Sequence, residues 1–386
     1  MSTPTTRIAI NFGGGYVPGL NALITGTVLA ASEIGWEVVG IRDGFDGLLF
    51  PDRYTDGGLV RLSRAMVEHL SGSSGSVLGT AARSDPFHVR IVNEENMVEE
   101  IDRSEELLQI IRSHKIDAVI SVVGPEPLSI LWKLSRKGLK TVAVPKSVEN
   151  DMAATSLSFG FDSALSFATE TIDRARQAAE STRTLGIIEV PGDRTGWLAL
   201  QSGIAVCADA ILIPEIRYDL HKVAASLREK AKAGRSHALV VVAEGAAPVN
   251  SQAAPTAPLP VDPLKAALSP GASGDQGAHV IERSGHVAER VALELQRLTN
   301  HETYPLVLGD LVRGGPPTAA DRQLGLAYGA AAVRALQENH SGMMVSFQPP
   351  DLKFVPLAET INRVRTVPAN SVFVQVARTL GISLGD

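Results

Sequence analysis

Short apolar runs that alternate with helical patterns constrain the fold of this chain more than any other feature of its sequence. A parallel strand that is buried on both faces reads as a continuous run of Val, Ile, Leu and Ala, and a crossover helix follows it. Runs of this kind occupy residues 8–12, 37–41, 118–123, 141–144, 186–190, 210–213 and 238–243. The alternation predicts an α/β fold with mainly parallel sheets, arranged as two Rossmann-like, three-layer lobes with a cleft between them.

The length of 386 residues agrees with this prediction, because at about 150 residues per domain it leaves room for two or three separate cores. Residues 246–275 are the exception to the alternation. Six prolines and eight alanines in this stretch break any hydrophobic period. We expect a mobile surface insertion there.

Composition and charge exclude several classes of protein. The net charge of −6 and the lack of a basic, aromatic-rich window argue against a nucleic-acid partner. Cys207 is the only cysteine, which excludes an internal disulfide and a cysteine-rich zinc site, and the nine histidines lack metal-ligand spacing. No apolar stretch approaches the ~18 residues of a membrane span, and residues 1–7 lack a signal-peptide core. We therefore expect a cytoplasmic protein without membrane contacts.

A glycine-rich segment follows the first predicted strand and leads into a helix. It reads Gly13-Gly14-Gly15 and continues through Asn21. At such a turn, glycines allow backbone N–H groups to approach a phosphate at the positive end of the helix. A turn that only needs tight packing would also use glycine. The segment by itself leaves both interpretations open.

A second polar segment, residues 145–151, follows the fourth predicted strand. It brings together Lys146, Ser147, Glu149 and Asp151. Phosphoryl transfer to a sugar needs a general base at the hydroxyl and a second carboxylate near Mg²⁺, and this pair of carboxylates meets that need. The alternative is a solvated acidic loop that caps a helix.

Glu244 and Arg313 also stand where a predicted strand ends or a loop begins. A carboxylate and a guanidinium at such positions can bind hydroxyl groups and phosphate, respectively. Each of them can equally belong to a structural ion pair.

Taken in order, these segments resemble the phosphofructokinase family, and within it the actinobacterial-type group that uses ATP or pyrophosphate. The resemblance runs nearly from end to end. It rests on residues 13–21, 40–44, 47–49, 78–80, 145–146, 150–151, 159–162, 196–197, 213–215, 243–245, 313–315 and 321–322. It implies a phosphofructokinase-like fold with a donor-side lobe at 1–160 plus 313–362 and a sugar-side lobe at 161–312 plus 363–386. It also implies Mg²⁺, ATP or pyrophosphate, a small-molecule substrate and a homo-oligomer, either a dimer or a tetramer.

The resemblance assigns a role to each matching position. It implies catalytic roles for Glu149 and Asp151, with Asp151 also as a ligand of Mg²⁺. It implies substrate contacts from Ser147, Thr184, Glu244, Tyr304, Asp310 and Arg313. It implies contacts with the donor phosphates from Gly14, Gly15, Arg83, Lys146 and Arg194.

Several donor-side positions depart from the family pattern. Pro125 replaces the aspartate that helps to hold Mg²⁺, and proline also lacks a backbone N–H for phosphate. Tyr16 replaces an aspartate after the first glycines, and Asp193 replaces an arginine that would neutralise the transferring phosphoryl group. Glu149 replaces the catalytic aspartate and has a longer side chain. Lys146, in contrast, matches the family members that use pyrophosphate.

The positions that bind the sugar 6-phosphate in the family differ even more in this chain. The family grips this phosphate with three arginines and a histidine, two of the arginines coming from a neighbouring subunit. Here only Arg313 remains, and the other positions align with Thr184, Tyr304 and Asp310. A hydrogen bond from a charged group contributes about 1.5–3 kcal/mol, so three such losses cost roughly 5–9 kcal/mol. These departures predict poor binding of fructose 6-phosphate.

Three hypotheses follow. The first is a diverged enzyme of this fold that acts on a small polyhydroxylated or anionic metabolite other than fructose 6-phosphate, with impaired phosphoryl-transfer sites. The second is an ATP- or pyrophosphate-dependent 6-phosphofructokinase or sugar phosphotransferase in which Glu126, Arg183 and Arg194 compensate for the lost groups. The third is a noncatalytic regulatory paralogue. We take the first as the working hypothesis.

Overall fold

The computed structural model describes residues 6–81, 84–92, 97–251 and 286–386. The chain forms two compact units: unit 1 comprises Met1–Ser163 and Arg313–Val364, and unit 2 comprises Ala164–Val312 and Arg365–Asp386. Most of the insertion predicted at 246–275 lies outside the described residues. The assignment of one lobe to the donor and the other to the sugar stays a prediction.

Unit 1 is built on a seven-stranded sheet with the order β13-β12-β7-β6-β1-β2-β3. Its strands are β1 (Arg7–Gly13), β2 (Glu37–Ile41), β3 (Leu59–Leu62), β6 (Ala118–Val123), β7 (Thr141–Pro145), β12 (Met343–Gln348) and β13 (Asp351–Pro356). The five central strands are parallel, and the edge strands β3 and β13 run antiparallel to their neighbours. A separate antiparallel pair consists of β4 (Val89–Val92) and β5 (Val98–Ile101).

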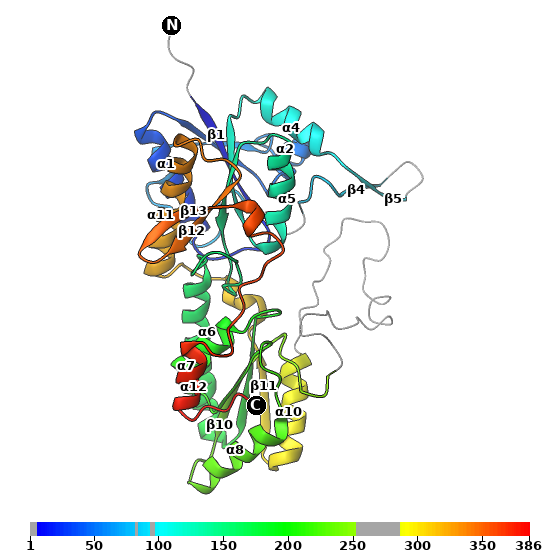
Figure 1. Ribbon diagram of the computed structural model, residues 1–386, viewed down its shortest axis with the longest axis vertical. Coiled ribbons are helices and arrows are strands. Elements are labelled where there is room, and N and C mark those ends of the chain that lie inside the picture. Colours follow the sequence, from blue (N-terminus) through cyan, green and yellow to red (C-terminus); the bar gives the residue numbers. More distant parts are fainter. Residues whose placement is uncertain (1–5, 82–83, 93–96, 252–285) are drawn as a thin grey trace. The chain divides into compact units, whose positions relative to one another are not determined.

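Helices cover both faces of this sheet. They are α1 (Leu20–Glu33), α2 (Asp46–Leu49), α3 (Arg64–Val67), α4 (Ser104–Ser113), α5 (Pro125–Arg136) and α11 (Ala319–Gln337), with 3₁₀ turns η1 (Pro51–Arg53) and η3 (Leu357–Glu359). α1 and α11 lie on one face, and α4 and α5 lie on the other (Figure 1). Every residue of β6 and β7 is buried between these layers, which is why the two strands read as unbroken apolar runs.

Glycine allows α1 and α11 to approach each other closely. A Cβ atom at Gly26 would lie 2.3 Å from the carbonyl oxygen of Leu326, and one at Gly329 would lie 2.5 Å from that of Leu23. Any larger residue at either position would push the helices apart. The two helices thus form a rigid layer behind the strands that carry the polar segments.

The register of the central strands brings three loops to one edge of the sheet. Gly13 pairs with Val123, and Val123 pairs with Pro145, so β1, β6 and β7 end at the same level. The segments that follow them begin with Gly14, Gly124 and Lys146. Ligands of doubly wound sheets bind at this carboxyl edge. The loops that leave it carry Gly14 and Gly15 after β1, and Lys146, Glu149 and Asp151 after β7.

Unit 2 has a parallel four-stranded sheet with the order β11-β8-β10-β9. Its strands are β8 (Leu185–Val190), β9 (Ala210–Leu212), β10 (Ala238–Ala243) and β11 (Thr303–Val307). Its helical elements are α6 (Phe161–Thr182), which begins in unit 1, α7 (Trp197–Ala205), α8 (Leu220–Lys232), α10 (His286–Thr299), η2 (Gly309–Arg313) and α12 (Val372–Thr379). α8 and α10 bury their apolar sides in one core with the sheet, and α7 and α12 lie on the opposite face (Figure 1).

The α/β fold with mainly parallel sheets that the sequence predicts is confirmed, and all seven predicted apolar runs are strands. Among the described residues, no helix is both long and apolar enough to span a bilayer.

Candidate active site

Lys146 lies inside the glycine turn of unit 1. Its side chain is 2% exposed, and its Nζ donates hydrogen bonds to the carbonyl oxygens of Gly14 and Gly15. Burial, together with a smaller effect of the nearby positive charge of Arg313, lowers the pKa of this ammonium from 10.5 to about 7. The lysine therefore joins the end of β7 to the end of β1.

The two candidate carboxylates follow Lys146 in a tight turn. Ser147 Oγ donates to Asp151 Oδ1 at 2.6 Å and accepts from the backbone N–H of Glu149 at 3.0 Å. Asn150 adopts a left-handed conformation with φ of 55°, and its Oδ1 accepts from the N–H of Ser158 at 3.0 Å. Asp151 is buried, whereas Glu149 retains some exposure. The turn fixes the backbone that carries both carboxylates.

Arg313 comes from much later in the chain and completes the group. Its Nη1 donates to the carbonyl oxygen of Tyr16 at 3.3 Å, and its Nη2 lies 3.7 Å from Glu149 Oε1. A Cβ atom at Gly15 would lie 3.5 Å from Nη1. Unit 1 thus gathers the glycine turn, Lys146, Glu149 and Arg313 in one place. The ion pair that was one interpretation of Arg313 is present, and it joins two candidate site residues.

The start of α5 has fewer backbone N–H groups for binding a phosphate than an ordinary helix start. Pro125 is the first residue of the helix, and Pro127 is the third, so only Glu126 among these three has an N–H group. A Cβ atom at Gly13 would lie 3.2 Å from Pro127 Cβ, and one at Gly14 would lie 3.3 Å from Pro127 Cγ. Pro127 therefore covers part of the glycine turn.

The candidates in unit 2 fall at opposite ends of its sheet. Glu244 follows the carboxyl end of β10, and its Oε1 accepts from the N–H of Gly192 at 3.2 Å. Thr184 immediately precedes β8, and Tyr304, near the start of β11, pairs with Gly186, so both lie at the amino end of the sheet. A strand of six residues spans roughly 20 Å. Within one copy of unit 2, Thr184 and Tyr304 are therefore not brought to the same place as Glu244.

The remaining predicted site residues are Arg194, Asp310 and Arg83. Arg194 and the exposed Asp193 lie in the loop after β8, and Asp310 is exposed in η2 after β11. Arg83 lies outside the described residues.

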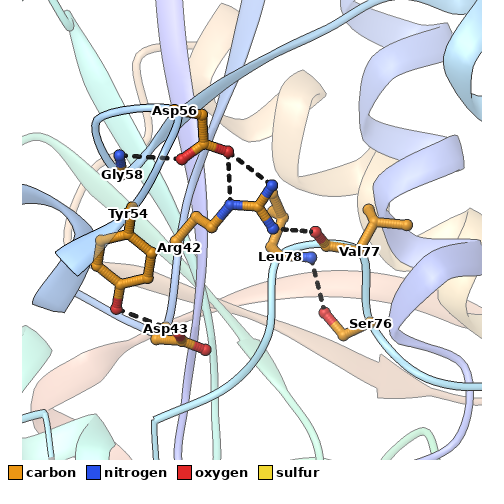
Figure 2. Close-up of polar contacts among 8 residues, drawn as sticks. All are labelled: Arg42, Asp43, Tyr54, Asp56, Gly58, Ser76, Val77 and Leu78. Atoms are coloured by element: carbon orange, nitrogen blue, oxygen red, sulfur yellow. Dashed lines mark hydrogen bonds and ion pairs between the residues drawn. The ribbon is translucent and has the colours of Figure 1, made fainter. Parts of the chain in front are cut away.

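Sequence reasoning missed a polar network next to the glycine turn. Arg42 donates through Nε to Asp56 at 2.7 Å and through Nη1 to the carbonyl oxygen of Val77 at 2.9 Å (Figure 2). The hydroxyl of Tyr54 donates to Asp43 Oδ2 at 3.1 Å. The run of serines and glycines at residues 71–79 was the available signal, because such a loop needs polar anchors to be ordered.

The sequence of this chain matches a known protein family and proteins of that family. The model of the family described as phosphofructokinase matches residues 7–336. This chain belongs to the phosphofructokinase family. An ATP-dependent 6-phosphofructokinase of Chloroflexus aurantiacus is 36% identical over all of this chain and 99% of its own length. ATP-dependent 6-phosphofructokinase 2 of Clostridium perfringens is 33% identical with full coverage of both chains.

Solved structures of the family share the fold. A pyrophosphate-dependent phosphofructokinase from Nitrosospira multiformis aligns with a TM-score of 0.74, at 20% identity, over 97% of this chain and 91% of its own. The phosphofructokinase of Saccharomyces cerevisiae aligns with a TM-score of 0.71, at 25% identity, over 92% of this chain and 45% of its own. The family resemblance read from the sequence is confirmed.

Phosphofructokinases imply Mg²⁺ and a phosphoryl donor, and the residues of unit 1 can be tested for them. The described residues contain no group of three or more His, Cys, Asp or Glu side chains that could hold a metal. Mg²⁺ in phosphoryl-transfer sites needs only one or two carboxylates, because phosphate oxygens and water complete its shell. Asp151 would supply one such carboxylate, and Arg313, with Lys146 when it is protonated, would supply positive charge for phosphate oxygens. These residues fit Mg²⁺ and a compact phosphate group.

Proposed function

We propose that this chain transfers a phosphoryl group to a hydroxyl of a phosphorylated sugar. The names of its end-to-end relatives, ATP-dependent 6-phosphofructokinases, support this second hypothesis better than the working hypothesis of a different metabolite. The observation that carries it is the grouping in unit 1 of two carboxylates, Glu149 and Asp151, with two cations, Lys146 and Arg313, at the ends of β1 and β7.

Each side chain then has a defined task. Glu149, which lies beside Arg313 and retains some exposure, accepts the proton of the attacking hydroxyl as general base. Asp151 is oriented by Ser147 and would hold Mg²⁺, which neutralises charge on the transferring phosphoryl group when bound. Lys146 and Arg313 stabilise the negative charge of the phosphate oxygens.

A second candidate keeps the first hypothesis, in which the substrate is another small polyhydroxylated or anionic metabolite. The contact of Pro127 with the glycine turn favours it, because this contact narrows the space for a donor. Asp193 and Asp310 favour it as well, because both are exposed carboxylates that repel a sugar phosphate.

³¹P NMR at enzyme concentrations high enough for a single turnover separates these functions. The protein is mixed with Mg²⁺, fructose 6-phosphate and either ATP or pyrophosphate. We expect fructose 1,6-bisphosphate to form at roughly 1–100 s⁻¹. Glu149→Gln should slow transfer by about 10²–10⁴-fold. Glu170→Gln, on the exposed side of α6, is the matched control and should leave the rate unchanged.

Absence of transfer by the folded wild-type protein would reject the proposal. Binding of a non-phosphorylated or differently charged metabolite in a screen would then support the second candidate. Co-purification with an active relative, unaffected by Glu149→Gln, would support a regulatory paralogue.

A further inference from the structure

The serine- and glycine-rich loop at residues 71–79 runs next to the glycine turn and has no role in the function proposed above. The chain that follows it pairs with the end of β1, since Gly14 N–H donates to the carbonyl oxygen of Ala81 at 3.0 Å. Ser73 and Ser74 are exposed, and Leu78 is buried. The loop therefore has an exposed polar part, and the chain that follows it is bonded to the glycine turn.

Both arms of the loop are fixed by side chains and a backbone N–H group of neighbouring elements. Asn21 on α1 accepts from the N–H of Val77 at 3.1 Å and donates to the carbonyl oxygens of Ser73 and Ser74 at 3.4 and 3.3 Å. Arg42 donates to the carbonyl oxygen of Val77 (Figure 2). The backbone N–H of Asp43 donates to the carbonyl oxygen of Leu78 at 2.9 Å. These anchors leave the tip at Gly75 between them.

Tyr16 holds the tip. Its hydroxyl accepts a hydrogen bond from the N–H of Gly75 at 2.7 Å. Gly75 has a φ of 80°, and no described atom lies within 4 Å of the place where its Cβ would be, so side-chain packing does not fix it. The carbonyl oxygen of the same Tyr16 accepts from Arg313 Nη1 at 3.3 Å. One residue thus contacts both the loop tip and the guanidinium of the candidate site.

We propose that Tyr16 is a positioning residue that couples the tip of loop 71–79 to Arg313, so that the loop closes over an anionic phosphate group bound by Lys146 and Arg313. This inference rests on the proposed function, because it takes the anion to be a reacting phosphate. A loop rich in glycine and serine loses much conformational freedom when it closes. A tether that holds it closed before binding reduces that cost and strengthens the binding of the anion.

Hydrogen exchange with Mg²⁺ and inorganic pyrophosphate as the probe tests the coupling. Tyr16→Phe removes only the hydroxyl and keeps the ring and the backbone contact to Arg313. Loss of one hydrogen bond of ~1 kcal/mol corresponds to roughly fivefold faster exchange at Gly75. We also expect the dissociation constant of magnesium pyrophosphate to rise about two- to fivefold, because the closed loop becomes less populated.

Tyr328→Phe is the matched control. Its hydroxyl donates to the carbonyl oxygen of Leu157 at 2.7 Å in the same unit and does not contact the loop. This variant should leave the exchange at Gly75 and the pyrophosphate affinity at wild-type values. Thermal melting checks that both variants fold.

Equal exchange at Gly75 in wild type and Tyr16→Phe, or equal pyrophosphate affinity, overturns the inference. A wild-type protein that does not bind magnesium pyrophosphate overturns it as well. Failure of the proposed function is a separate result, because it shows as absent transfer to fructose 6-phosphate while pyrophosphate binding and loop exchange remain measurable.

Discussion

At the scale of single residues, the buried ammonium of Lys146 makes a prediction about stability and pH. The pKa of Lys146 is lowered from 10.5 in the unfolded chain to about 7 in the folded protein. Between these two values the unfolded state binds more protons than the folded state, so the free energy of unfolding rises with pH in this window. The increase is at most ~1.4 kcal/mol per pH unit.

Chemical denaturation at pH 7, 8 and 9 measures this increase. The difference in the free energy of unfolding between wild type and Lys146→Met should grow with pH, since methionine keeps most of the volume and does not titrate. The lost hydrogen bonds to Gly14 and Gly15 add an offset that does not depend on pH. A difference that stays flat across the three pH values would contradict the lowered pKa.

Sequence patterns predict the site residues that directly follow a strand, but they do not predict contacts between segments that are distant in the chain. The rule that parallel strands end at one edge of a sheet points to Lys146, Glu149 and Asp151, and that rule depends only on local apolar runs. Tyr16 is recognisable from the sequence only as a departure from the family pattern, because its contact partner Gly75 lies 59 residues later in a loop. The separation of Thr184 from Glu244 likewise required the strand register.

At the scale of elements, the same reasoning found four of the five central strands of unit 1 and three of the four strands of unit 2. It missed β12, the edge strands β3, β11 and β13, and the separate pair of β4 and β5. All seven predicted runs are buried strands, whereas β11 contains Pro305 and is largely exposed. Proline is tolerated on an edge strand, where one side of the backbone has no partner. β3 and β13 are also only partly buried, so neither has the continuous apolar run that marks a central strand.

The start of α6 depends on a carboxylate from another helix. Asp321 on α11 is 1% exposed and accepts hydrogen bonds from the N–H groups of Gly160 and Ser163, both at 2.7 Å, and from Ser163 Oγ at 2.6 Å. It satisfies donors that the first turn of a helix leaves without intrahelical partners. Asp321→Ala would leave two buried N–H groups without an acceptor, and each costs about 1–3 kcal/mol.

We therefore expect Asp321→Ala to lower the free energy of unfolding by roughly 2–6 kcal/mol, measured by urea denaturation with circular dichroism. Asp173→Ala, at an exposed position of α6, is the control and should change stability by no more than about 0.5 kcal/mol. If both substitutions have the same small effect, the carboxylate of Asp321 does not hold the start of α6.

At the scale of the whole molecule, the placement of candidates in unit 2 raises the question of a second copy. Thr184 and Tyr304 stand at the end of the sheet opposite to Glu244, so one copy cannot use all three in a single site. The family resemblance implies that two phosphate-binding positions come from a neighbouring subunit, and these are the positions of Thr184 and Tyr304. In an oligomer, Thr184 and Tyr304 of one copy would contribute to the site of a neighbouring copy, while Glu244 serves the site of its own copy.

The edge formed by β11 and η2 has the character of such an interface. Tyr304 is 58% exposed and Leu311 is 66% exposed, and Val307 lies between them. An exposed apolar edge strand favours pairing with another chain. Light scattering after size exclusion, at micromolar concentration, should show a dimer or tetramer of the 40.8 kDa chain.

Leu311→Glu tests whether this edge carries the contact. A carboxylate buried at an interface weakens association, and we expect the dissociation constant to rise at least tenfold, about 1.4 kcal/mol. Met66→Glu places the same charge on an exposed apolar position of unit 1 and should leave the mass unchanged. A monomeric wild type, or a Leu311→Glu variant as oligomeric as the wild type, would show that Thr184 and Tyr304 serve no partner site through this edge.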